Sequence, residues 1–274
     1  MSLKSLINYI SNTQITSEIL NKIQENNQLN IIGSSRYAKS ILIESIAKKE
    51  NKDILLVAPN TETAFKWYGY FEAINNNNVL YYPPNENLPY SSINKSKENE
   101  YQQLSVLSKL LNSKEINNNI LITTERALQP HLIDKKLIKE NKIILKKGEN
   151  IEIKDLSNKL ETIGYEKENL TSEEGKWSRR GEIVDIYPVN NEFPIRLEFF
   201  DNVIDKIREY DPSTQKTLDS INKVEIVQAG YSTLIRNKLI NLSKDEIFNP
   251  KKRTNNIDRF IGLINQNPSN IIDF

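Results

Sequence analysis

The sequence contains no cysteine and a single histidine, His131, among its 274 residues. The absence of cysteine excludes disulfide bonds and thiolate metal sites, and one histidine is too few for a histidine-based metal centre. A Ser/His/Asp triad is not expected either. A chain without cysteine fits a reducing compartment, so we expect a cytoplasmic location.

Long apolar runs and an excess of one charge are also missing. No apolar run approaches the roughly 20 residues that span a bilayer, and the N-terminal stretch lacks the apolar core of a signal peptide. Lys and Arg (37) nearly balance Asp and Glu (36), which leaves a net charge of +1. We therefore expect no membrane partner, and a charged binding patch must be local.

The first 145 residues alternate short apolar runs with helical stretches, which is typical of a parallel α/β sheet. From about residue 145 turn signals become frequent and the apolar period shortens to two, which indicates a separate α+β unit with an antiparallel β-meander. Strands are predicted at 29–32, 53–58, 79–82, 119–123, 182–189, 194–200, 203–210 and 224–227, and helices at 37–49, 61–74 and 234–248.

The octet GSSRYAKS, residues 33–40, follows the first predicted strand and opens a helix. A P-loop reads G-x-x-x-x-G-K-[ST] in that position, because backbone N–H groups, the lysine and the hydroxyl hold the phosphates and Mg²⁺. Gly33, Lys39 and Ser40 fit this pattern. Ala38 replaces the second glycine, and its Cβ obstructs the close approach of backbone to phosphate. The octet therefore predicts a degenerate P-loop.

Nucleotide hydrolysis also needs an acidic residue at the end of another strand to hold Mg²⁺. The predicted strands offer only Glu125, without an adjacent acid. A structural loop is the favoured interpretation, and we expect no cofactor in this chain. A residual nucleotide or anion site and an intact ATPase remain as alternatives.

The predicted strand FPIRLEFF, residues 193–200, alternates between an apolar face and a second face that carries Arg196 and Phe200. Arg180 precedes Gly181 in the preceding strand and reaches the same edge in a hairpin. Arginine beside an exposed aromatic residue is a common composition of protein-interface hot spots. The alternative is an ordinary amphipathic hairpin with a solvated arginine and a partly buried phenylalanine.

The stretches RRGEIVDIYP and FPIRLEFFDNVIDKIREYDPSTQKTL, within residues 175–218, resemble the N-terminal module of the bacterial transcription-repair coupling factor (Mfd). That module is in turn similar to the repair protein UvrB. The segments YYPPNENLPYSSINKSKENEYQQLSVLSKL, residues 81–110, and ILITTERALQPHL also resemble the family. The resemblance spans essentially the whole chain.

The resemblance implies a RecA-like domain 1a with a degenerate P-loop at residues 1–145, an inserted α+β domain 2 at 146–220, and the start of domain 1b at 221–274. It implies that domain 2 binds the damage-recognition protein UvrA, and by motif position the contacts fall on Arg180, Arg196 and Phe200. Replacing either arginine by alanine is then expected to abolish UvrA binding without changing the thermal melt.

The family also implies that this module is not itself an enzyme. The ATP- and Mg-dependent translocase, and the regions that bind RNA polymerase and double-stranded DNA, would lie beyond residue 274. The alternative is an ATP-binding, DNA-engaging helicase domain of the UvrB type. UvrB inserts a long aromatic-rich β-hairpin into DNA, whereas the stretch after Tyr82 is short and rich in proline, with Tyr81, Tyr82 and Tyr90 as its tyrosines.

Overall fold

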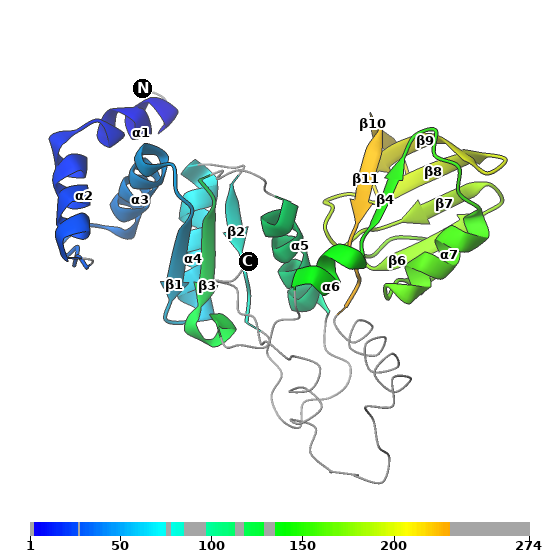
Figure 1. The fold of residues 1–274 in the computed structure, drawn as a ribbon, viewed down its shortest axis with the longest axis horizontal. Coiled ribbons are helices and arrows are strands. Elements are labelled where there is room, and N and C mark those ends of the chain that lie inside the picture. Colours follow the sequence, from blue (N-terminus) through cyan, green and yellow to red (C-terminus); the bar gives the residue numbers. More distant parts are fainter. Residues whose placement is uncertain are drawn as a thin grey trace, which may run out of the picture. The chain divides into compact units, whose positions relative to one another are not determined.

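The computed structural model describes residues 3–26, 28–74, 78–84, 97–112, 118–128 and 135–230. The chain divides into two compact units (Figure 1). Unit 1 contains Met1–Glu86 and Ser113–Gln129, and unit 2 contains Asn87–Asn112 and Pro130–Phe274. Each unit is described by itself below.

Unit 1 is built on a parallel sheet, as the sequence predicts. Its strands are β1 (Ile54–Ala58), β2 (Val79–Tyr81) and β3 (Ile120–Thr124), and they lie in the order β1-β3-β2. The central strand places Ile122 opposite Leu56 on one side and Tyr81 on the other. Side chains of the strands and of helix α4 form the core, which explains why the central strand is completely buried.

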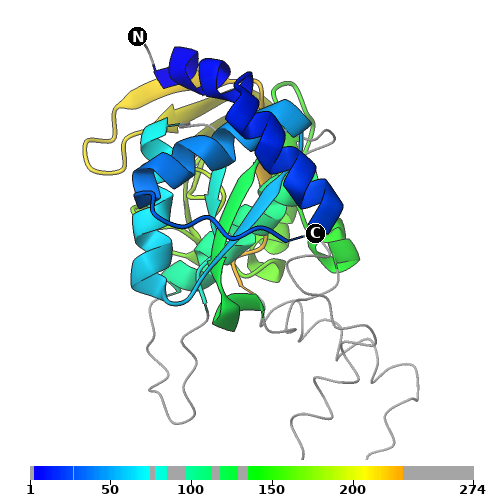
Figure 2. The same ribbon diagram turned by 90° about the vertical axis from the view of Figure 1, so that its left-hand side faces the viewer.

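The helices of unit 1 are α1 (Leu3–Ser11), α2 (Gln14–Asn26), α3 (Arg36–Glu50), α4 (Thr61–Ile74) and the 3₁₀ turn η1 (Glu125–Leu128). Helices α3 and α4 confirm the predictions at 37–49 and 61–74. Helix α3 ends at Asn51, which adopts the left-handed conformation (φ 50°) and donates its N–H to the Ala47 carbonyl. Helices α1 and α2, dark blue in Figure 2, pack against α3.

The predicted strand at residues 29–32 is wrong. These residues form an extended connection outside the three-stranded sheet, and Ile32 is 89% exposed. A run of four residues with three apolar side chains is too short for a periodicity that separates a buried strand from an exposed connection. Here the chain passes from this run through Gly33, at φ +83°, directly into the cap of α3.

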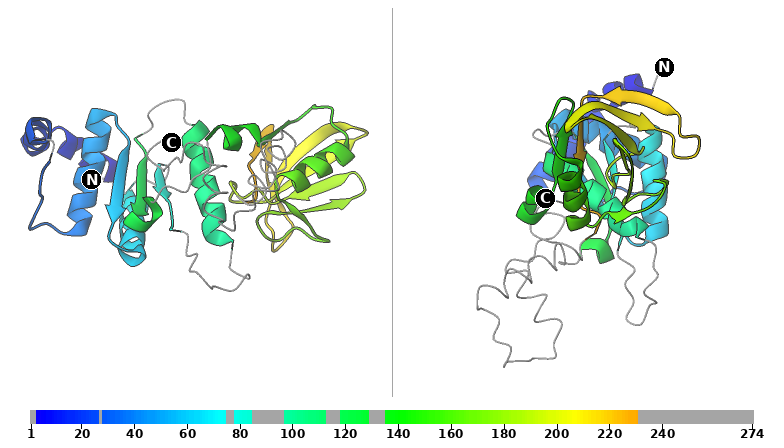
Figure 3. Two further views of the ribbon diagram at one scale, coloured as in Figure 1. Left: turned by 60° about the horizontal axis from the view of Figure 1, so that its bottom comes forward. Right: turned by 90° about the vertical axis from the view of Figure 1, so that its right-hand side faces the viewer.

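Unit 2 contains a six-stranded sheet in the order β10-β9-β8-β7-β6-β5, which Figure 3 shows as one twisted layer. Its strands are β5 (Glu166–Lys167), β6 (Lys176–Arg180), β7 (Ile183–Ile186), β8 (Ile195–Phe200), β9 (Val203–Tyr210) and β10 (Thr217–Ile221). Strands β6 to β10 are antiparallel neighbours. The predicted meander is therefore confirmed.

Two further strands and three helices complete the described part of unit 2. They are β4 (Ile143–Lys146), β11 (Lys223–Ile226), α5 (Glu98–Asn112), α6 (Lys135–Glu140) and α7 (Ile153–Thr162). Helix α7 covers one face of the sheet (Figure 1), and its Leu156 and Leu160 share a buried cluster with Trp177. The alternation of β8 places Ile195 and Leu197 in the same core, as predicted.

The limits of unit 2 differ from the predicted domain limits at 145/146 and 220/221. Strand β4 crosses the first limit and β10 crosses the second, and β4 pairs with β11, with Leu145 opposite Val224. Helix α5 also belongs to this unit, because Tyr101 and Leu104 are buried in its core cluster. The predicted helix at 234–248, His131 and Tyr90 lie outside the described residues.

None of the helices in the described part of the chain combines the length and the apolar character that crossing a membrane requires.

Candidate functional site

Residues 33–40 of unit 1, which the sequence predicts to be a degenerate P-loop, use their polar groups to start helix α3. The helix begins at Arg36, so only three residues of the octet precede it. The Ser35 hydroxyl accepts the N–H of Ala38 at 3.2 Å, and the Ser35 carbonyl accepts the N–H of Lys39 at 3.0 Å. These two donors are therefore already paired, whereas a P-loop offers such N–H groups to phosphate.

The Ser40 hydroxyl is also occupied. It donates to the Tyr37 carbonyl at 2.7 Å, and the residue is fully buried. Glu125, the acidic candidate for Mg²⁺, lies exposed in η1 just after β3. Within the described ranges no three His, Asp or Glu side chains gather as a metal site.

The candidate interaction residues of unit 2 come together on one face of the sheet. Arg180 pairs with Ile183, and Ile183 pairs with Glu198 on the next strand. Arg196 and Phe200 flank Glu198 at two residues' distance and therefore point to the same side. We call this surface the β6–β8 face, formed by Arg180, Ile183, Asp185, Arg196, Glu198 and Phe200.

Phe200 is the most exposed apolar side chain of this face, at 73%. It ends β8 next to a tight turn in which Asp201 adopts φ +53°. The turn is tied to the segment before α7, because Ile151 donates its N–H to the Asn202 carbonyl at 2.8 Å and Gly148 donates to Ile204 at 2.8 Å. A fixed hairpin end thus presents the phenyl ring to solvent.

Arg180 is exposed at the end of β6. Its guanidinium makes one long hydrogen bond, from Nη2 to the Asn169 carbonyl at 3.3 Å. The neighbouring Arg179 folds back and donates from Nε to the Gly181 carbonyl at 2.9 Å. Arg180 can therefore turn toward a partner at little cost.

Arg196 has very different surroundings. Its Nε and Nη2 donate to the two carboxylate oxygens of Asp185 at 2.7 and 2.8 Å, and Nη2 also donates to Gln215 Oε1 at 3.0 Å. The guanidinium lies 4.6 Å above the ring of Tyr210. Bonding to Asp185 raises the pKa of Arg196. The alternative of an ordinary hairpin with a solvated arginine does not describe Arg196, because this side chain is 25% exposed and paired with Asp185.

Sequence reasoning missed Asp185, Tyr210 and Gln215, the three residues that hold Arg196. Asp185 is 5% exposed, and the Oη of Tyr210 donates to the Thr171 carbonyl at 3.1 Å. A signal for Asp185 exists in the sequence EIVDI, where an acid interrupts an otherwise apolar strand. Pairing the two strands of the meander places Arg196 directly opposite it.

The rest of the β6–β8 face mixes apolar and charged groups. Ile183 is 38% exposed. Glu198 accepts from Arg208 at 3.1 Å and lies 3.4 Å from the Lys206 Nζ on β9. An aromatic anchor, an aliphatic neighbour and basic groups in one surface are the composition of a protein-binding site.

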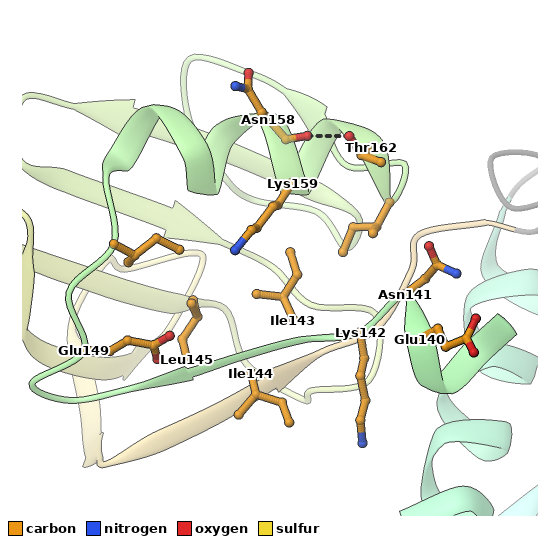
Figure 4. Close-up of a pocket in the computed structure, with 12 residues that line it drawn as sticks. Glu140, Asn141, Lys142, Ile143, Ile144, Leu145, Glu149, Asn158, Lys159 and Thr162 are labelled. Atoms are coloured by element: carbon orange, nitrogen blue, oxygen red, sulfur yellow. Dashed lines mark hydrogen bonds between the residues drawn. The ribbon is translucent and has the colours of Figure 1, made fainter. Parts of the chain in front are cut away.

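A second surface feature of unit 2 is a cleft of about 400 Å³ between α7 and β4 (Figure 4). Ile143 and Leu145 form its floor, and Lys159 reaches over them from α7. Its two carboxylates, Glu140 and Glu149, lie at opposite ends of the cleft in Figure 4. Glu149 accepts the backbone N–H of Lys146 at 2.9 Å, so part of the polar lining is already satisfied.

Comparison with known proteins gives a family match inside unit 2. Residues 143–230 match the model of the UvrB interaction domain. These limits agree with the strand order. The match begins at Ile143, the first residue of β4, and the strands of the six-stranded sheet lie between β4 and its partner β11 in the sequence.

The wider chain is similar to transcription-repair-coupling factors. It is 31% identical to that of Staphylococcus epidermidis over 230 residues, which cover 83% of this chain and 19% of the relative. It is 29% identical to that of Haemophilus influenzae and 26% identical to that of Escherichia coli, each over 192 residues, 70% of this chain and 16% of the relative.

The chain thus spans less than a fifth of the length of these relatives. The resemblance expected from the sequence is confirmed by both comparisons. The chain is similar to transcription-repair-coupling factors over most of its length, and its residues 143–230 match the UvrB interaction domain.

Proposed function

We propose that this chain is a non-catalytic, UvrB-like module that binds UvrA through the β6–β8 face and so recruits it in transcription-coupled repair of DNA damage. The exposed ring of Phe200 on an anchored hairpin carries the proposal. The free energy of removing such a ring from water is gained only when a partner covers it. The family match of residues 143–230 supports this surface as the interaction site.

The geometry of the degenerate P-loop supports a non-catalytic role for the module. Two backbone donors of the loop cap α3, and the Ser40 hydroxyl is buried in a hydrogen bond to Tyr37. The RecA-like description of unit 1 is part of this proposal. It is supported by the parallel order β1-β3-β2, in which β3 lies between β1 and β2.

The proposed role places the module in a longer protein. By similarity to the coupling factors, that protein would be an ATP-dependent DNA translocase that displaces stalled RNA polymerase, and its motor would use ATP and Mg²⁺. Its partners would be RNA polymerase and double-stranded DNA, besides UvrA. All of these are cytoplasmic in bacteria, and we propose the same location for this chain.

The partner proposal is tested by titrating purified UvrA with the 274-residue chain and with Arg180→Ala and Phe200→Ala variants. Truncating an interface anchor costs about 2 kcal/mol or more, or roughly thirtyfold in Kd. Both side chains are exposed, so the thermal melts of the variants should match that of the parent. Parent-like affinity of both variants, or no binding by the parent, would contradict the proposal.

The non-catalytic part is tested separately by calorimetry with Mg-ATP. We expect no binding heat in the parent chain or in Lys39→Ala. Heat in the parent that disappears in Lys39→Ala would favour the ATP-binding UvrB-type alternative.

A further inference from the structure

Two N–H groups of Arg196 are not used in its hydrogen bonds to Asp185 and Gln215. The guanidinium carries five N–H groups. The Nε hydrogen and both Nη2 hydrogens are directed at Asp185 and Gln215. Within the described residues the hydrogen bonds of Arg196 start from Nε and Nη2, which leaves Nη1 on the edge away from the carboxylate.

The fork with Asp185 fixes the direction of that free edge. A bidentate arginine–carboxylate pair restricts both the position and the plane of the guanidinium. The Tyr210 ring at 4.6 Å closes one side of the plane. The side chain keeps 25% exposure, and Nη1 is the guanidinium nitrogen that the bonds to Asp185 and Gln215 do not use.

We propose that Asp185 is a positioning residue of the UvrA-binding face, which orients Arg196 so that its Nη1 edge donates to a carboxylate of the partner protein. This inference rests on the proposed function. It assigns Asp185 a role although the side chain itself is buried and does not reach the surface. It also distinguishes the two arginines, since Arg180 is adjustable and Arg196 is fixed in advance.

The charge of the surroundings selects a carboxylate as the acceptor. Asp185 already balances the charge of Arg196, and Glu198 is shared between Arg208 and Lys206 on the neighbouring strand. Arg180 adds a further cation on β6. With Arg208 and Lys206 of β9 counted beside the β6–β8 face, an acidic side chain of the partner meets more cations than anions, which favours its approach.

The test is a double-mutant cycle on the 274-residue chain, with the affinity for purified UvrA and the melting temperature measured for every variant. Asp185→Asn keeps the shape of the side chain but replaces one acceptor by a donor, which breaks the fork. Arg196→Lys keeps the charge but has no planar edge. Each single variant should weaken UvrA binding about tenfold, the loss of one good contact.

The double variant decides whether Asp185 acts through Arg196. If it does, Asp185→Asn has no further effect on affinity in the Arg196→Lys background, because the positioned group is already gone. Additive losses would mean that Asp185 affects UvrA by another route and would overturn the inference. So would parent-like affinity of Asp185→Asn.

Tyr165→Phe is the matched structural control, because Tyr165 lies in the buried core cluster of unit 2 and is not part of the β6–β8 face. The change removes the hydroxyl that donates to the Val227 carbonyl at 3.0 Å and accepts the N–H of Val189 at 3.2 Å. The melting temperature should fall while the affinity for UvrA stays within about twofold of the parent, a difference of roughly 0.4 kcal/mol. A loss of affinity as large as that of Asp185→Asn would show that general destabilisation explains both. Failure of the parent chain to bind UvrA would instead overturn the proposed function.

Discussion

The degenerate P-loop of unit 1 and the β6–β8 face of unit 2 both place basic and aromatic side chains next to each other. In the loop, the hydroxyls of Ser35 and Ser40 form hydrogen bonds with the backbone of helix α3, and the backbone N–H of Lys39 is paired as well. On the face, Phe200 remains open to solvent and Arg180 makes a single long bond. The polar groups of the loop are paired within its own helix, whereas Phe200 and Arg180 on the face remain accessible to another molecule.

This difference teaches that residue types alone do not identify a site. Lys39 and Ser40 stand in the positions of a phosphate-binding motif, yet the geometry around them is that of an ordinary helix start. Arg180 and Arg196 belong to one face, yet only one of them is solvated. The hydrogen-bond partners of each group decide what it can still bind.

The largest effect should come from Arg196, the partly buried arginine of the face. Arg196→Ala leaves the Asp185 carboxylate buried without its counter-ion, and breaking such a pair costs about 3 kcal/mol. Arg180→Ala removes an exposed side chain and should stay within about 0.5 kcal/mol of the parent. Urea unfolding of both variants measures the contrast.

This prediction replaces the expectation that neither arginine affects the thermal melt. If Arg196→Ala unfolds at the same urea concentration as Arg180→Ala, the ion pair with Asp185 contributes nothing and the contrast between the two arginines fails.

A smaller effect is expected from an exposed ion cluster of the same unit. Glu166 accepts from Lys176 at 2.7 Å and from Lys97 at 2.8 Å, and these bonds lower its pKa from 4.5 to about 2. Because Glu166 is 54% exposed, solvent screens the pairs and Glu166→Gln should cost roughly 1 kcal/mol at neutral pH.

The sign of the pH dependence follows from the lowered pKa. A carboxylate with a depressed pKa stabilises the folded state above its unfolded value and loses this contribution as pH falls. The stability difference between the parent and Glu166→Gln should therefore shrink between pH 4.5 and pH 2. A difference that stays constant over this range would show that the cluster is not ionised as described.

The smallest effect is expected in the loop itself. Ser40→Ala removes the bond to the Tyr37 carbonyl, but alanine has the higher helix propensity, so the two changes nearly cancel. The free energy of unfolding should change by no more than about 0.5 kcal/mol. A loss of several times that size would mean that the loop depends on Ser40 in a way that α3 does not explain.

The strands and helices with clear periodicity could be predicted from the sequence. Helix α4 and the hairpin of β8 and β9 follow directly from apolar spacing and a two-residue turn. The strand at 29–32 failed because its apolar residues are exposed, a property that depends on neighbours far along the chain.

The candidate site was predictable as a face but not as a set of contacts. Alternation in β8 places Arg196 and Phe200 on one side of the sheet. It does not show that Asp185 binds one of them, because that contact needs the register between two strands. A cross-strand pair of this kind contributes to sheet stability, and a pattern along one strand does not contain it.

The early position of helix α5 in the sequence affects when unit 2 can fold during synthesis. A chain is synthesised from its N-terminus, so Tyr101 and Leu104 leave the ribosome before Trp177 and Val184, which share their buried cluster. Until about 70 further residues have followed, the apolar side of α5 has no sheet to pack on. Lys97 likewise has no partner until a similar number of residues has been synthesised and Glu166 is present. Unit 2 therefore completes its fold late, around a helix that was translated early.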